Sequence, residues 1–366
     1  MTTTLNDLIG FESMLGTVED VKNGLPADVM APGMLNVTKT LEGAQGSYFR
    51  VDGTRETAVR VAYGGASIRA DQKGVSKVPV TLIHSFEHID HTPTTLMQLQ
   101  DFDSPRRQAL GAQEVGRQTG HFFQRQRNLQ ISAVMSAMTL GAIYFDGSGN
   151  LLPSSSGAVV TIDFGVPAGN QDQLDILGDG DIITASWGTA GTDIISQVHA
   201  IVTAMVQNSG YRPTTAYYGP NVPGYFASNT SMINFVKGNA AIAGALAQGI
   251  IPDNTAGLNW RPLAEAFFVD EDGDIQVWTG DDTVVFAPEV DRSWWQYLEG
   301  TYPVPTDLGV VTQNAGQMMA NVAEVPGFFS YATLVSDPVT VRQFAGTTML
   351  PVIAAPKAIA IAEVTP

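Results

Sequence analysis

The chain has 366 residues, of which 44% are hydrophobic, and a formal net charge of −17, a composition typical of a folded globular protein. It contains no cysteine, which excludes disulfides, cysteine-ligated metal sites and thiol catalysis. The acidic charge argues against a protein that wraps nucleic acid, because phosphate binding needs a concentrated cationic face.

The first 45 residues contain several helix-breaking glycines and prolines, and we predict that they form an extended arm. They lack the basic and apolar regions of a signal peptide. No uninterrupted apolar run in the sequence approaches the ~20 residues of a transmembrane helix, so we expect no membrane contact.

A long β-hairpin is predicted over residues 46–90. Apolar side chains alternate with small or charged ones at 59–63, and β-branched and apolar residues return at 78–86. The connection between these strands is rich in glycine and basic residues. Because a two-stranded ribbon has little stability of its own, we expect it to rest on another surface.

A long helix is predicted to follow, with Ser104 as its N-cap, Pro105 at its first position and a stop at Gly141. Roughly 36 helical residues would extend about 54 Å, which is long for a globular core. The first half is polar and basic, and the second half is mostly apolar. We interpret this helix as a strut that leaves one domain; the alternative is a break into two helices at one of the glycines in its first half.

The remaining elements predict an α+β fold. A tight turn at 146–150 precedes a strand at 158–164, and an acidic linker at 172–181 marks a boundary. The later elements are a helix over residues 192–207, a strand over 215–218, a helix near 223–235, a strand-rich block over 263–286, and strands over 331–334, 339–344, 349–353 and 358–364.

The segment His84-Ser-Phe-Glu-His88 matches the H-x-x-E-H pattern of one class of zinc hydrolases. That chemistry needs both histidines on one face of a helix, whereas this segment continues a run that is typical of a β-strand. On a strand the two histidines are ~13 Å apart. We therefore interpret them as surface or interface residues, and a metal-dependent hydrolase that uses His84 and His88 is the alternative.

No other motif indicates an enzyme. Residues 270–274 resemble the start of a calcium-binding loop, but Ile275 occupies the position where that loop needs glycine, so a hairpin turn is favoured. The sequence has no phosphate-binding loop, dinucleotide-binding glycine motif or nucleophile elbow. We predict a protein with no enzymatic activity, cofactor or metal.

Charge is distributed unevenly. Residues 50–127 hold 11 Lys and Arg against 8 Asp and Glu, whereas the rest of the chain holds 8 against 28. Opposite fields on one molecule favour head-to-tail association of its copies, although a solvated mixed-charge face is the alternative. We predict subunit-interface roles for the basic residues of the hairpin and the long helix, which are Arg50, Arg55, Arg60, Arg69, Lys73, Lys77, Arg106, Arg107, Arg117, Arg125 and Arg127.

Four more specific features follow one another along the chain. They are Trp187 followed by Asp193-Ile-Ile, Gly210-Tyr-Arg-Pro213 before the strand at 215–218, the run at 282–288, and a strand-rich end at 326–364. Together with the ribbon and the long helix, this order resembles the major capsid proteins of tailed bacteriophages. These proteins have the Hong Kong 97-type fold, and the resemblance is to the lambda major capsid protein E family in particular.

The resemblance implies a division of the chain. Residues 1–45 would be the N-terminal arm, 46–90 the extended loop, 91–181 the peripheral domain with its spine helix, 182–325 the axial domain, and 326–366 the closing strands of the peripheral domain.

The resemblance also implies a function. The chain would be the major capsid protein of a tailed double-stranded DNA phage, assembling through pentamers and hexamers into an icosahedral shell. That shell would enclose DNA without sequence-specific binding. Portal, scaffolding and decoration proteins would be further partners, and the protein would assemble in the host cytoplasm and reside in the virion. A bacterial encapsulin-like nanocompartment shell is the alternative.

Overall fold

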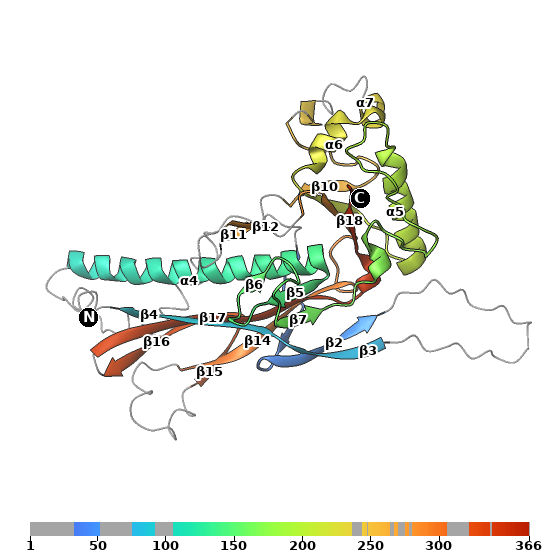
Figure 1. The fold of residues 1–366 in the computed structure, drawn as a ribbon. Helices are drawn as coiled ribbons and strands as arrows, with labels where there is room; N and C mark the ends of the chain where they lie inside the picture. Colours follow the sequence, from blue (N-terminus) through green and yellow to red (C-terminus); the bar gives the residue numbers. More distant parts are fainter. Residues whose placement is uncertain are drawn as a thin grey trace, which may run out of the picture.

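A computed structural model describes residues 33–51, 75–91, 105–235, 244–246, 248–263, 267–269, 275–277, 280–305, 322–336 and 339–365. Its longest element is α4 (Pro105–Leu140), a helix of 36 residues that lies along a large sheet. A second unit, made of a smaller sheet and several helices, stands at one end of this helix (Figure 1). The predicted α+β fold class is confirmed.

The large sheet is organised around β17 (Val339–Ile353), a strand of 15 residues. Along one edge, β17 pairs first with β16 (Phe328–Ser336) and then with β14 (Trp295–Pro305). Along its other edge it pairs with β4 (Ile83–His91), and all three pairings are antiparallel. Two short strands pair with β14, namely β1 (Lys39–Leu41) and β15 (Val322–Pro326).

Helix α4 packs on one face of this sheet. Phe123 meets Phe328 of β16 edge-on, with ring centroids 5.1 Å apart, and Gln130 donates a hydrogen bond to Thr347 of β17. Every residue from 132 to 139 is buried, whereas the middle of the helix is buried on one side only. The prediction of a helix that is wet along one part and buried along another is therefore confirmed for the residues whose side chains are described.

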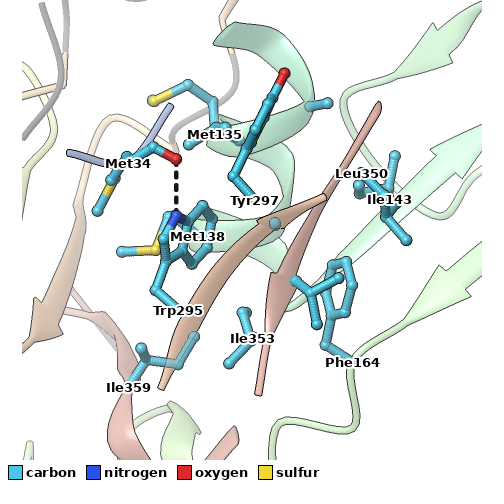
Figure 2. Packing of buried hydrophobic residues seen from close by; sticks show 14 of the residues in the cluster. Met34, Met135, Met138, Ile143, Phe164, Trp295, Tyr297, Leu350, Ile353 and Ile359 are labelled. Atoms are coloured by element: carbon cyan, nitrogen blue, oxygen red, sulfur yellow. Dashed lines mark hydrogen bonds between the residues drawn. The ribbon is translucent and has the colours of Figure 1, made fainter. Parts of the chain in front are cut away.

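The main hydrophobic core lies between α4 and the sheet (Figure 2). Met138 from α4, Trp295 from β14 and Ile353 from β17 are among its members. The indole nitrogen Nε1 of Trp295 donates a hydrogen bond of 2.8 Å to the carbonyl oxygen of Met34. This bond fixes the segment that leads into β1 onto the core.

The second unit is built on a five-stranded sheet. Helix α5 (Ile194–Ser209) begins at Asp193, whose side chain accepts a hydrogen bond from the backbone N–H of Ser196, and ends at Gly210 in the left-handed region. Trp187, Phe226 and Trp260 fill the core of this unit. Its strands, in spatial order, are β10 (Asn259–Pro262), β9 (Thr215–Tyr218), β13 (Thr283–Ala287), β18 (Ala360–Glu363) and β8 (Gln171–Asp172), and its short helices are α6 (Val222–Ser228) and α7 (Thr230–Phe235).

The five-stranded sheet separates the two hydrophobic cores. Val284 and Phe286 of β13 belong to the core of the second unit, whereas Val285 and Ala287 belong to the main core. Residues of β18 alternate in the same way. Because successive side chains of a strand point to opposite faces, both faces of this sheet are buried and the two units share one wall.

Three small groups of strands complete the described fold. The strands β2 (Gln45–Val51) and β3 (Val75–Thr81) form an antiparallel ribbon. A three-stranded sheet follows α4 and contacts its C-terminal part. Its strands are β5 (Ala142–Phe145), β6 (Leu151–Leu152) and β7 (Val160–Asp163), and a separate hairpin is formed by β11 (Phe267–Val269) and β12 (Ile275–Val277).

The predicted long helix is confirmed, and the alternative of two helices is wrong, because α4 is continuous. It ends as predicted at Gly141, which has φ +65° and donates its N–H to the carbonyl oxygen of Ala137. The predicted N-cap, Ser104, lies outside the described residues. Near the C-terminus, the two strands expected at 339–344 and 349–353 are one strand, β17, because no residue between them interrupts the pairing with β16 and β4.

The predicted hairpin is only partly described. Its strands β2 and β3 pair as expected for a hairpin, while the strand predicted at 59–63 lies outside the described residues. The predicted return strand divides at Leu82, after which β4 leaves the ribbon and joins the large sheet. Strands β11 and β12 pair as the prediction of a turn at 270–274 requires, but the turn residues themselves are not among those described.

Strand pairing crosses two of the segment boundaries expected from the resemblance. β14 falls within residues 182–325 but pairs in the large sheet, and β18 falls within 326–366 but pairs in the five-stranded sheet. Both exchanges arise from partners distant in sequence, which local patterns do not specify. The division into arm, loop, peripheral and axial segments stays a prediction.

We expect Gly141→Ala to destabilise the subunit by about 2 kcal/mol or more, since alanine is strained at positive φ and its Cβ would lie 2.8 Å from Cγ2 of Val166. Gly149→Ala is the matched control, because Gly149 has φ +88° but open space around its Cα. Gly149→Ala should lower the free energy of unfolding only by the cost of the strained backbone, about 1 kcal/mol. Thermal unfolding measures both variants, and equal losses would contradict the role of the Val166 contact.

Candidate assembly surfaces

The structure places five of the eleven basic residues that the sequence predicts at subunit interfaces. Arg55, Arg60, Arg69 and Lys73 lie outside the described residues. Arg106 and Arg107 lie in the first turn of α4, but their side chains are outside the described part of the structure. The placed residues are Arg50, Lys77, Arg117, Arg125 and Arg127.

Arg50 holds the ribbon on its own chain. Its guanidinium nitrogen Nη2 donates a hydrogen bond of 3.1 Å to the carbonyl oxygen of Gly165, just after β7. Tyr48, two residues earlier on β2, is buried in the main core, and burial raises the pKa of its hydroxyl. The expectation that the ribbon rests on another surface is therefore confirmed for its base, and that surface belongs to the same subunit.

The arginines of α4 also have partners within the subunit. Arg125 forms an ion pair of 3.0 Å with Glu87 of β4. Arg127 donates a hydrogen bond of 3.4 Å to the side chain of Gln130, and Nη1 of Arg117 lies 3.2 Å from Nε2 of His121, one helical turn away. Such contacts on an exposed helix face contribute only about 0–1 kcal/mol each.

Three of the placed cations, Lys77, Arg117 and Arg125, are exposed. Lys77 on β3 is exposed and makes no hydrogen bond or ion pair with any described residue. Its cross-strand neighbour on β2 is Phe49, whose exposed fraction is 56%. Arg117 is exposed on α4. The ribbon therefore presents an apolar ring and a cation together, a combination suited to a partner surface.

The H-x-x-E-H segment lies on β4, as its strand pattern predicts. His84 stacks on Phe86 and on Tyr302 of β14, with ring centroids 6.0 and 5.2 Å apart. Nδ1 of His84 also lies 2.8 Å from Oγ1 of Thr348, and burial lowers its pKa. The strand geometry separates His84 from His88 along the sheet, so it gives no support to the hydrolase alternative.

These rings are part of an aromatic strip on the sheet face opposite α4. Phe86 stacks on Phe344 of β17 at 5.2 Å, and Tyr302 stacks on Phe329 of β16 at 4.3 Å. Tyr331 joins the strip beside Phe344. This surface was not predicted from the sequence. Aromatic rings at alternate positions in β4 and β16 would have indicated it, because alternate residues of a strand share one face.

A buried polar network on the opposite face was also missed. The side-chain amide nitrogen of Gln343 donates a hydrogen bond of 2.7 Å to Oγ1 of Thr119 on α4. The oxygen Oε1 of the same amide lies 2.9 Å from Nε2 of His91 on β4. One side chain thus links the central strand, the edge strand and the helix. Because buried polar groups are costly when unpaired, this network fixes the register of α4 on the sheet.

A cleft of about 950 Å³ lies where β4, α4 and the three-stranded sheet meet. Its lining includes Glu87 and Ser85 of β4, Gln126 of α4 and Val159 and Val160 at the start of β7. A second cavity of about 460 Å³ lies between the ribbon and β7.

Acidic groups gather on the second unit. Asp179 and Asp181 are exposed in the loop after β8, and Asp253 pairs with Arg261 at 3.6 Å. Partial burial opposes ionisation of Asp282, but hydrogen bonds from Tyr225, Asn221 and Thr365 outweigh it and lower the pKa of its carboxyl. The bond to Asp282 in turn raises the pKa of Tyr225 to about 12. The carboxyl group of Asp282 therefore remains charged at neutral pH.

The described residues contain no group of three or more His, Asp or Glu side chains placed to hold a metal ion. None of the helices among them is both long enough and apolar enough to cross a bilayer.

No protein-family model and no curated protein matches the chain. Among solved structures, the putative capsid protein of a prophage of Escherichia coli CFT073 is 12% identical, with a TM-score of 0.54 over 98% of this chain and 99% of that one. The chain has the fold of that capsid protein. A phage-related protein from Bordetella bronchiseptica RB50 is 10% identical with a TM-score of 0.48, covering 96% of each chain. The satellite phage P4 procapsid is 9% identical with a TM-score of 0.48, covering 97% of this chain and 90% of that one.

The predicted capsid fold is thus confirmed, whereas membership of the lambda family stays a prediction. The interface roles of the eleven basic residues also stay predictions. Arg50, Arg117 and Arg125 already have partners in their own subunit, whereas Lys77 is exposed and has none among the described residues.

We expect the double change Lys77→Glu and Arg117→Glu to block assembly while leaving the subunit folded. Each site is exposed, so the free energy of unfolding should change by about 0.5 kcal/mol or less per site. Contacts with acidic surfaces of other copies would become repulsive, and added salt should partly restore them. Sedimentation gives the particle yield and circular dichroism the folding control. Unchanged yield would show that these cations are only solvated.

Arg50→Glu is the contrasting variant. It removes the hydrogen bond to Gly165 and places a carboxylate beside a carbonyl oxygen, so we expect it to lower the melting temperature of the isolated subunit. If Arg50→Glu left subunit stability unchanged and lowered only particle yield, Arg50 would belong with the intermolecular cations after all.

Proposed function

We propose that this protein is the major capsid protein of a tailed double-stranded DNA bacteriophage. In this role it assembles through pentamers and hexamers into an icosahedral shell that encloses the genome. The observation that carries the proposal is the shared fold with a putative prophage capsid protein over nearly the whole of both chains. Coverage of nearly the whole of both chains matters, because the likeness is then not confined to one part of the fold.

The subunit's surface supports self-association. The ribbon of β2 and β3 presents Phe49 and Lys77 away from the core, and an aromatic strip with Phe86 exposed covers one face of the large sheet. Exposed contacts of this kind are weak one at a time. A closed symmetric shell repeats each of them at every equivalent interface, so that weak contacts suffice.

The remaining parts of the proposal follow from the same role. The protein is not an enzyme, needs no cofactor and encloses DNA without sequence-specific binding. Its partners are other copies of itself, a portal protein, and scaffolding or decoration proteins. It assembles in the host cytoplasm and remains in the virion.

The test is the assembly state of the purified protein. We expect pentamers, hexamers or closed particles by light scattering and negative-stain microscopy, because the exposed apolar and basic groups are otherwise left in water. A single 38.9 kDa species at high concentration, with and without salt, would contradict the proposal. Nucleic acid inside native particles would distinguish a phage shell from a nanocompartment shell.

A further inference from the structure

The cleft between β4, α4 and the three-stranded sheet contains two acceptor atoms that the subunit leaves unsatisfied. Oε2 of Glu87 and Oε1 of Gln126 are buried, and neither has a hydrogen-bond partner among the described residues. Gln126 is 98% buried, at 2% relative exposure. An unpaired buried acceptor costs about 1–3 kcal/mol, so two in one cleft indicate a missing donor.

The other polar atoms of these side chains are already used. Oε1 of Glu87 pairs with Arg125 at 3.0 Å, and the amide nitrogen of Gln126 donates a hydrogen bond of 3.0 Å to Oγ of Ser85. These contacts leave Oε2 of Glu87 and Oε1 of Gln126 for a ligand. Both remaining atoms are acceptors, and one belongs to a carboxylate. A cationic donor satisfies this pair best, because charge-assisted hydrogen bonds are the stronger kind.

Two exposed valines mark the rim of the cleft. Val159 and Val160 are 71% and 53% exposed. Leu129 and Phe145 also line the cleft, together with polar residues such as Asp146. A lysine or arginine side chain matches this mixed lining, since its aliphatic stem covers apolar surface while its charged end binds acceptors. A small inorganic cation would leave the valines exposed.

We propose that this cleft receives a lysine or arginine side chain from a second copy of the chain. The proposal rests on the proposed function, which supplies the second copy. Charge complementarity supports this occupant: the subunit carries exposed cations, Lys77 and Arg117 among them, and the cleft offers a carboxylate oxygen that its own Arg125 does not bind. Residues of β4 also line the cleft, and among the described strands β4 pairs with β17 alone.

Cysteine accessibility tests this assignment. Because the chain contains no cysteine, Val160→Cys creates a single reactive thiol on the rim, and Val159→Cys provides a second position. The probe is a maleimide applied to free subunits and to assembled particles. We expect the labelling rate to fall about tenfold or more on assembly, since thiol reactivity requires exposure. Equal rates in subunits and particles at both positions would overturn the proposal.

Removal of the carboxylate provides an independent measurement. With Glu87→Gln we expect the concentration of free subunit in equilibrium with particles to rise about fivefold or more. Asp253→Asn is the matched control, because it also removes one negative charge from an exposed ion pair but lies away from the cleft. Equal effects of the two variants would mean that only net charge matters, and would overturn the assignment.

These experiments distinguish a failure of the proposed function from a wrong occupant of the cleft. If the unaltered protein forms no assemblies, the proposed function fails. If it forms particles in which the rim cysteines stay reactive and Glu87→Gln behaves like Asp253→Asn, only the occupant of the cleft is wrong. Circular dichroism of each variant establishes that the subunit remains folded.

Discussion

The match in length between one helix and one strand is the constraint on which the rest of the fold depends. A helix of 36 residues such as α4 extends about 54 Å, and a strand of 15 residues such as β17 extends about 50 Å. Figure 1 shows the two lying along one another. The buried side of α4 packs along this continuous strand. The amide of Gln343 then fixes how the two align.

The connection from β17 to β18 also holds the second unit in place on the large sheet. After Ile353 the chain makes one short turn and enters β18, whose alternate residues pack into the two different cores. A strand buried on both faces cannot slip by one residue without exchanging its two sets of side chains. The two units therefore cannot rotate freely about their junction. In the proposed shell, such rigidity would preserve the angle at which neighbouring copies meet.

Local sequence patterns were sufficient to predict the helices and strands, but they did not predict which distant segments contact one another. Pro105 and Gly141 bound the long helix because they act within a single turn of backbone, and the strand at 215–218 was visible in a run of four residues. The pairing of β14 with β17, and the hydrogen bond from Arg50 to Gly165, join residues far apart in sequence. The pattern of positive charge marked the ribbon and the long helix, but it did not show which cations form contacts within the subunit.

The difference between groups that are used within the subunit and groups that are left over follows from the order of folding and assembly. A shell subunit has to fold before it meets its neighbours, so groups that secure the fold are already bound when assembly begins. Arg50, Arg125 and the amide of Gln343 are of this kind. The groups left over are Lys77, the exposed ring of Phe49 and the unpaired oxygens of Glu87 and Gln126. Each is individually weak or mildly unfavourable in the isolated subunit. In the proposed shell, assembly would satisfy these groups together, which would make the closed particle favourable while any single contact stays reversible.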